Sequence, residues 1–317
     1  MNTYSLTCGL SAFFLCTSSP LMAQTVVGVT GDAGFGNLSS NSFYEIDTAN
    51  GTTTLKGSSS ITPNQLAFDV VTNNYYYMDH YGSNFYRFDI DTGTEYNLAD
   101  LTTVGMPVDK IGSGGGDFYN GRYYYTPESG SQGIYQISFN SDGSGIQSHT
   151  EITPHNLGDF SDLSDGSSRA GLGDFGDVAV NTATGKMYGT SNMHNNGTNY
   201  TAFWSIDLND PNYTMELIST SITSVYQLAF DEANILWANQ WASDPGETRG
   251  QLVSLNLSNG EIESTRTMTN NGDDTLGDFY DLASTNIRQS PDTIPEPSQV
   301  SLFAATALLT LLRRSRK

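Results

Sequence analysis

The feature that most constrains this chain is an internal repeat in which two short patterns alternate. The first is a strand of alternating aromatic and polar residues that ends at an Asp, Asn or Gly turn, as in Ser42–Asp47. The second is a polar residue followed by a short apolar run, as in Gln65–Phe68. Further copies of the first pattern are Asn84–Asp89, Gly133–Ser138, Ala202–Asp207 and Gln251–Asn256. Recurrence of one strand-and-turn unit is typical of repeat architectures built from small sheets.

The second pattern allows the sheets to be counted. Its polar residues are Gln65, Asp117, Asp177, Gln227 and Asp281, spaced by 52, 60, 50 and 54 residues. Each of the first four begins a set of four short strands, three strands precede them, and a single strand at Asp281 comes last. These strands make five sheets of four, so the sequence predicts an all-β, five-bladed β-propeller. Its last strand would enter the first blade as the innermost member. Six blades are the alternative, if residues 146–175 form a blade rather than an inserted loop.

Composition limits the environment in which such a domain works. The 18 Tyr, 15 Phe and 3 Trp supply buried area that disordered chains lack. The chain has 34 acidic and 13 basic residues, and four of the basic ones lie within the last five positions. Without that basic end, the chain is strongly negative and repels phosphate backbones and anionic lipids. This charge argues against nucleic-acid binding. The only cysteines, Cys8 and Cys16, fall in the expected leader, so the mature chain would have no disulfides.

Residues 1–23 have the order of a secretory signal peptide. The apolar segment Leu10–Leu15 is followed by Pro20–Ala23, which places a small residue where signal peptidase would cut. We therefore expect a signal helix over residues 1–23 and a propeller domain over residues 24–288. A buried N-terminal strand or helix is the alternative.

The C-terminal end has a motif, an apolar run and a basic cluster in that order. Pro295, Glu296 and Pro297 come first, then Val300–Leu312, and then a cluster that includes Arg313 and Arg314. The prolines keep the motif extended, and the basic cluster would stay on the cytoplasmic side of a membrane. The apolar run has 13 residues, fewer than the roughly 20 that span a bilayer. We therefore expect a linker over 289–297 and a short hydrophobic helix over 298–317 that inserts transiently. An ordinary C-terminal core helix is the alternative.

This order resembles the PEP-CTERM sorting signal of Gram-negative bacteria. The resemblance implies that an exosortase recognises the chain and cleaves it near Pro295–Pro297, after export through the inner membrane. The protein would be membrane-anchored before this processing and then lie at the cell surface or outside the cell. Proteins with this signal are associated with bacteria that make exopolysaccharide and biofilms. The resemblance covers the tail alone and does not define the activity of the body.

The polar residues of the second pattern are the candidate site. The innermost strands of a propeller line a central channel, so Gln65, Asp117, Asp177, Gln227 and Asp281 would face one axis. Carboxylate and amide oxygens suit Ca²⁺ or Mg²⁺. The sequence therefore predicts a cation site at the channel mouth, with Ca²⁺ as the candidate ion. The alternative is that each side chain caps its own strand end or a neighbouring loop.

Three functions stay open at this point. We expect a non-catalytic exported propeller that binds or helps to build extracellular matrix, with exopolysaccharide or surface proteins as partners. The alternative is a secreted polysaccharide hydrolase or lyase that uses the channel-mouth carboxylates, since glycoside hydrolysis needs two carboxyl groups at a defined separation. A purely structural surface-layer component is the third. No nucleophile, phosphate-loop or zinc motif is recognisable in the sequence.

Overall fold

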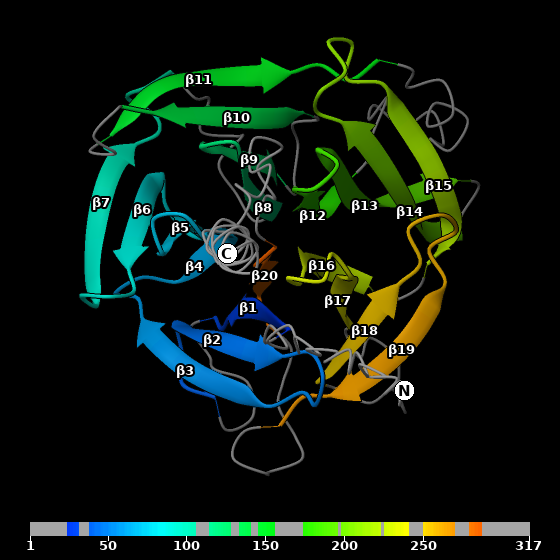
Figure 1. Ribbon diagram of the computed structural model, residues 1–317. Coiled ribbons are helices and arrows are strands. Elements are labelled where there is room, and N and C mark those ends of the chain that lie inside the picture. Colours follow the sequence, from blue (N-terminus) through cyan, green and yellow to red (C-terminus); the bar gives the residue numbers. More distant parts are fainter. Residues whose placement is uncertain are drawn as a thin grey trace, which may run out of the picture.

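The computed structural model describes residues 24–31, 38–105, 114–127, 133–140, 145–155, 174–195, 198–222, 225–240, 250–269 and 279–286. These residues form strands and turns, and the strands build five four-stranded antiparallel sheets around a central axis (Figure 1). The protein is therefore a five-bladed β-propeller, as the repeat predicted. The six-bladed alternative is wrong, because the ring closes with five sheets.

Each blade runs from an innermost strand near the axis to an outermost strand at the rim. Blade 1 contains β20 (Asp281–Ala283), β1 (Thr25–Val29), β2 (Ser42–Asp47) and β3 (Thr53–Ser58). Blade 2 contains β4 (Pro63–Asp69), β5 (Asn74–Asp79), β6 (Asn84–Asp89) and β7 (Thr94–Asp100). Blade 3 contains β8 (Gly114–Tyr119), β9 (Arg122–Pro127), β10 (Ile134–Phe139) and β11 (Ile146–Ile152). Blade 4 contains β12 (Asp174–Asn181), β13 (Lys186–Asn195), β14 (Thr198–Asp207) and β15 (Met215–Ile222). Blade 5 contains β16 (Val225–Phe230), β17 (Leu236–Gln240), β18 (Gln251–Leu255) and β19 (Ile262–Thr267).

The last strand closes the ring, which confirms the predicted topology. β20 pairs antiparallel with β1, with Val29 opposite Asp281 and Val27 opposite Ala283. A second link lies at the rim, where a parallel bridge joins Thr52 of blade 1 to Thr269 of blade 5. The last strand thus completes blade 1 at the axis, and blades 1 and 5 are joined again at the rim.

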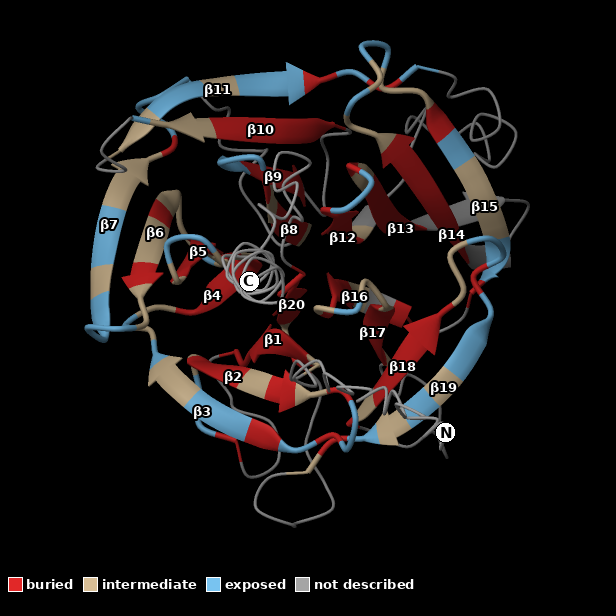
Figure 2. Cartoon of the chain, viewed as in Figure 1, coloured by how far each residue is buried: buried red, intermediate tan, exposed pale blue. Residues whose placement is uncertain are grey.

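Burial falls from the axis to the rim (Figure 2). Strands β4 and β5 are almost entirely buried, whereas β7 and β19 consist of exposed and half-buried residues. The inner strands have neighbouring blades on both faces, which explains why aromatic and β-branched residues occupy them. Both tyrosine runs, Tyr75–Tyr77 and Tyr123–Tyr125, are buried, with exposed fractions of 0–5%.

Aromatic rings fill the space between adjacent blades. The clearest case is Phe43 of blade 1, whose ring centroid lies 4.9 Å from Tyr75, 5.2 Å from Tyr77 and 5.1 Å from Phe88 of blade 2. Rings at these separations contribute beyond the apolar area that they bury. Phe43 therefore anchors the boundary between the first two blades.

The predicted ends of the chain lie outside the described residues. The signal helix over 1–23, the linker over 289–297 and the hydrophobic tail over 298–317 stay predictions. In the ranges that are described, the structure has no helix with the length and apolarity needed to cross a bilayer.

The boundary between blades 1 and 2 gives a stability prediction. We expect Phe43→Ala to lower the free energy of unfolding by about 3–5 kcal/mol, because it leaves a cavity among three rings. Equilibrium urea unfolding of the full chain measures this loss. Leu55→Ala is the control, since Leu55 is 53% exposed on β3 and should change stability by less than about 0.5 kcal/mol. A loss below about 1 kcal/mol for Phe43→Ala would contradict the assignment.

Candidate functional site

The five predicted site residues lie on the innermost strands, one in each blade. Gln65 and Gln227 are the third residues of β4 and β16, and Asp117 and Asp177 are the fourth residues of β8 and β12. Asp281 is the first residue of the short β20. The strands thus begin two or three residues earlier than the sequence indicated, except in blade 1. Four of the five are buried at 0–1% exposure, and Gln227 is half-buried. They form part of the channel wall.

The innermost strands leave one edge without a neighbouring strand, and their buried N–H groups need acceptors. The Asp281 carboxylate accepts from the N–H of Leu66, which belongs to blade 2. The Asp177 carboxylate accepts from the N–H of Leu228 in blade 5, at 2.6 Å. An aspartate of one blade therefore binds the buried inner edge of the next blade.

Asp117 makes the same kind of link and adds a third blade to it. Its Oδ2 accepts from the N–H of Val180 in blade 4 at 2.6 Å and from the Ser284 hydroxyl at 2.7 Å. The Ser284 Oγ in turn accepts from the N–H of Phe230 in blade 5, at 3.0 Å. Ser284 directly follows β20, so one hydrogen-bonded chain joins blades 3, 1 and 5.

The choice of Asp or Gln at each position has a local reason. Each aspartate also accepts from the N–H of the residue that follows it, at 2.6–2.9 Å. The two glutamines make no such bond, so the N–H groups of Leu66 and Leu228 are available to the aspartates of the preceding blades. Gln65 instead adopts a φ of 55° and donates its Nε2 to the carbonyl of Thr126 in blade 3, at 3.0 Å.

Burial changes the proton affinity of the three aspartates. Desolvation raises the pKa of Asp117 to about 6, although hydrogen bonds from Ser284, Val180 and Phe118 oppose the rise. Desolvation also raises the pKa of Asp177 well above its usual value, and the neighbouring charge of Asp281 adds to this effect. The pKa of Asp281 is likewise raised by desolvation. The charges of Asp177 and Asp281 oppose each other, so ionisation of one carboxyl group disfavours ionisation of the other.

These contacts bear on the predicted cation site. The carboxylate oxygens of Asp117, Asp177 and Asp281 already accept hydrogen bonds from backbone N–H groups. Within the described ranges, no group of three or more His, Cys, Asp or Glu side chains is arranged to hold a metal ion. The amide oxygens of Gln65 and Gln227 are buried and have no hydrogen-bond partner in the described part of the chain. The calcium site stays a prediction, and an ion there would compete with the bonds that join the blades.

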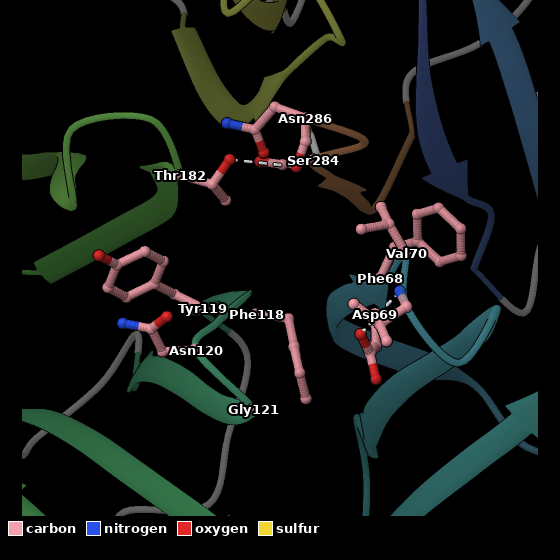
Figure 3. Close-up of a pocket in the computed structure, with 11 residues that line it drawn as sticks. Phe68, Asp69, Val70, Phe118, Tyr119, Asn120, Gly121, Thr182, Ser284 and Asn286 are labelled. Atoms are coloured by element: carbon pink, nitrogen blue, oxygen red, sulfur yellow. Dashed lines mark hydrogen bonds between the residues drawn. The ribbon is translucent and has the colours of Figure 1, made fainter. Parts of the chain in front are cut away.

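A cavity of about 390 Å³ lies at the C-terminal ends of the innermost strands (Figure 3). We call it the central cavity. The ends of β4 and β8 and the segment after β20 converge on it, and Thr182 from the turn after β12 completes the wall. Its described lining residues are Phe68, Asp69, Val70, Val71, Phe118, Tyr119, Asn120, Gly121, Thr182, Ser284 and Asn286. The sequence did not indicate this cavity, because its walls come from segments of four blades that meet only in the closed ring.

The central cavity combines aromatic surface with hydrogen-bonding groups. The half-buried Phe118 ring stacks on Tyr76 with centroids 5.2 Å apart. Thr182 donates its hydroxyl to the carbonyl of Asn286 at 3.2 Å, and the Asn286 Nδ2 donates to the carbonyl of Val180 at 3.0 Å. Asp69 is the one carboxylate among the described lining residues, and it accepts from the turn that follows it. Fixed polar groups beside aromatic faces are typical of small-molecule and sugar sites.

A second cavity, of about 480 Å³, lies beside the first at the boundary of blades 1 and 2. We call it the side cavity. It shares Phe68 and Val70 with the central cavity, so the two adjoin along these residues. Its other described lining residues are Thr25, Val27, Glu45, Lys56, Asn73, Tyr75, Ile90, Asp91, Glu232 and Thr285.

The raised pKa of Asp117 gives a prediction with a definite sign. The folded-state pKa of Asp117 lies above the usual 3.8. The contribution of Asp117 to the free energy of unfolding is therefore full below about pH 4, and it is lost as the pH rises through about 6. A rise of that size corresponds to about 3 kcal/mol. Asp117→Asn removes the titrating group. We therefore expect the free energy of unfolding of the wild type, measured relative to that of the variant, to fall by about 3 kcal/mol from about pH 4 to pH 8. Urea unfolding of both proteins at the two pH values measures this difference in free energy of unfolding. A difference that stays constant would contradict the burial of a titrating carboxyl.

Comparisons with known proteins add little to this geometry. No family model and no curated protein matches the chain. A solved structure of a nidogen/laminin complex is similar to it with a TM-score of 0.47 and 11% sequence identity, over 76% of this chain and 76% of that chain. The fold assignment therefore stands on the strand pairing described above.

Proposed function

We propose that this protein is an exported, non-catalytic propeller of the bacterial cell surface, and that its central cavity binds exopolysaccharide. The observation that supports this most directly is the cavity itself, in which Phe68 and Phe118 line the same space as Thr182 and Asn286. A sugar ring has an apolar C–H face and a rim of hydroxyls. Aromatic rings and fixed polar groups match these two surfaces.

The positions of the acidic residues favour binding over hydrolysis. A glycoside hydrolase places two carboxyl groups on either side of the scissile bond. Here Asp117, Asp177 and Asp281 are 0–1% exposed, and each accepts hydrogen bonds from neighbouring blades. They are therefore held as part of the ring, away from solvent. The central cavity has one carboxylate, Asp69, among its described lining residues.

Export and sorting are the part of the proposal that rests on the two ends of the sequence. The leader over 1–23 supports translocation, with signal peptidase as the processing enzyme. The Pro295–Pro297 motif, the apolar run and the basic end support recognition by an exosortase. The large negative charge of the body, within a net charge of −21, suits a protein that stays soluble outside the cell.

Val71 provides a test of the binding site. It is 88% exposed and lines the central cavity from the turn after β4, so a large side chain there can obstruct the cavity without disturbing the core. We expect Val71→Trp to weaken glycan binding by at least about tenfold, through loss of contacts worth about 1.4 kcal/mol or more. Calorimetry of the purified full chain with hexamers of glucose, N-acetylglucosamine and glucosamine measures the affinity.

Ile262→Trp is the matched control, because Ile262 is 47% exposed on the outer strand β19 and lines neither cavity. Its affinity should equal that of the wild type. Absence of binding to every hexamer, or equal affinities for the two tryptophan variants, would refute the proposed site.

A further inference from the structure

We infer that the side cavity recognises positively charged amino groups, so that the ligand is a polysaccharide with free amines. This inference rests on the proposed function, because it assigns the chemical class of the glycan that occupies the joined cavities. The two cavities share Phe68 and Val70. A chain of sugars that extends past Phe68 and Val70 would therefore contact both cavities.

The Phe68 ring is the shared apolar surface. It is half-buried and packs against Tyr75 of the side cavity, with ring centroids 5.4 Å apart and a tilt of 57°. Tyr75 is 1% exposed and fixed in the core, which holds Phe68 in place between the cavities. An ordered aromatic ring at such a junction suits a ligand with repeated ring units.

The charges of the side cavity do not balance. Its described lining residues include three carboxylates, of Glu45, Asp91 and Glu232, and one cation, Lys56. Lys56 pairs with Glu45 at 3.1 Å, which leaves two negative charges without a cation in the described lining. A ligand with an ammonium group supplies the missing charge, and an anionic ligand would be repelled.

The two remaining carboxylates are held by neutral groups. Glu232 accepts from the N–H and the hydroxyl of Thr25, at 2.6 and 2.8 Å. Asp91 accepts from the Nδ2 of Asn73 at 2.7 Å. These bonds fix the positions of the two carboxylates. Glu232 is partly withdrawn from water, and this desolvation raises its pKa. A partly desolvated carboxylate gains more from an arriving cation than an exposed one does.

A lysine-rich peptide carries the same ammonium group, but the lining favours a sugar. The hydroxyls of Thr25 and Thr285 and the amide of Asn73 lie among the lining groups of the side cavity. Together with the shared Phe68 ring, they match the hydroxyl rim and apolar face of a sugar unit. We therefore assign the site to an amino polysaccharide, and the peptide serves as a competitor in the test.

The experiment compares two hexamers of the same backbone, glucosamine and N-acetylglucosamine, at a pH where the free amine is protonated. We expect calorimetry of the full chain to give at least about tenfold tighter binding of the glucosamine hexamer. This preference should weaken as salt is added. The double variant Asp91→Asn, Glu232→Gln should reduce the preference to within about twofold, since it retains acceptors for Asn73 and Thr25 but removes both charges.

Asp207→Asn is the control for the loss of charge, because Asp207 lies at the end of β14 in blade 4 and lines neither cavity. It should keep the full preference. Equal affinities for the two hexamers, or a preference that survives the double variant, would overturn the inference. Competition by octalysine as strong as that by the glucosamine hexamer would overturn the assignment to sugar. If the neutral hexamer binds and Val71→Trp abolishes its binding, the proposed function stands even though the amine preference fails.

Discussion

A ring of sheets around a channel leaves the inner edge of every first strand without a neighbouring strand. The N–H groups along that edge are buried, and each one left without an acceptor costs about 1–3 kcal/mol. In this propeller the carboxylates of Asp117, Asp177 and Asp281 accept from the edges of the next blades. The same bonds hold adjacent blades together at the axis, so satisfying the backbone and closing the ring are one event.

This arrangement determines where function can lie. The channel carboxylates are buried, and burial raises the pKa of each. They serve as links within the ring. Ser284 connects this interior to the surface, because it binds Asp117 and also lines the central cavity. The open chemistry lies at the ends of the innermost strands, where the turns of several blades form the central and side cavities.

The architecture could be predicted from the sequence because it repeats. Five polar residues at similar spacings, three strands before them and a single strand after them define both the number of blades and the closing strand. The convergence of Asp117, Asp177 and Asp281 on one channel also followed from that pattern. Their partners did not, because the acceptors of one blade meet the donors of the next only when the ring is complete.

Other features depend on contacts that no local pattern records. The glycines Gly115 and Gly116 stand in β8, where a Cβ atom would collide with the Asp177 carboxylate and with the carbonyl of Gln65. Their role is close approach to the neighbouring blades, which the sequence around them does not show. The central cavity was missed for the same reason, since Phe68, Phe118 and Asn286 come from three blades. The charge imbalance of the side cavity likewise joins residues as distant in sequence as Glu45 and Glu232.

The most direct measurement of the ring bonds is native-state amide hydrogen exchange of the full chain, followed by NMR at Leu66, Val180, Leu228 and Phe230. These four N–H groups donate to side chains of other blades. We expect them to exchange only through global unfolding, as slowly as the central ladder amides of the inner strands. Exchange at the rate of the surface turns would show that the inner edges are open to water, and would contradict the closure of the ring by these aspartates and Ser284.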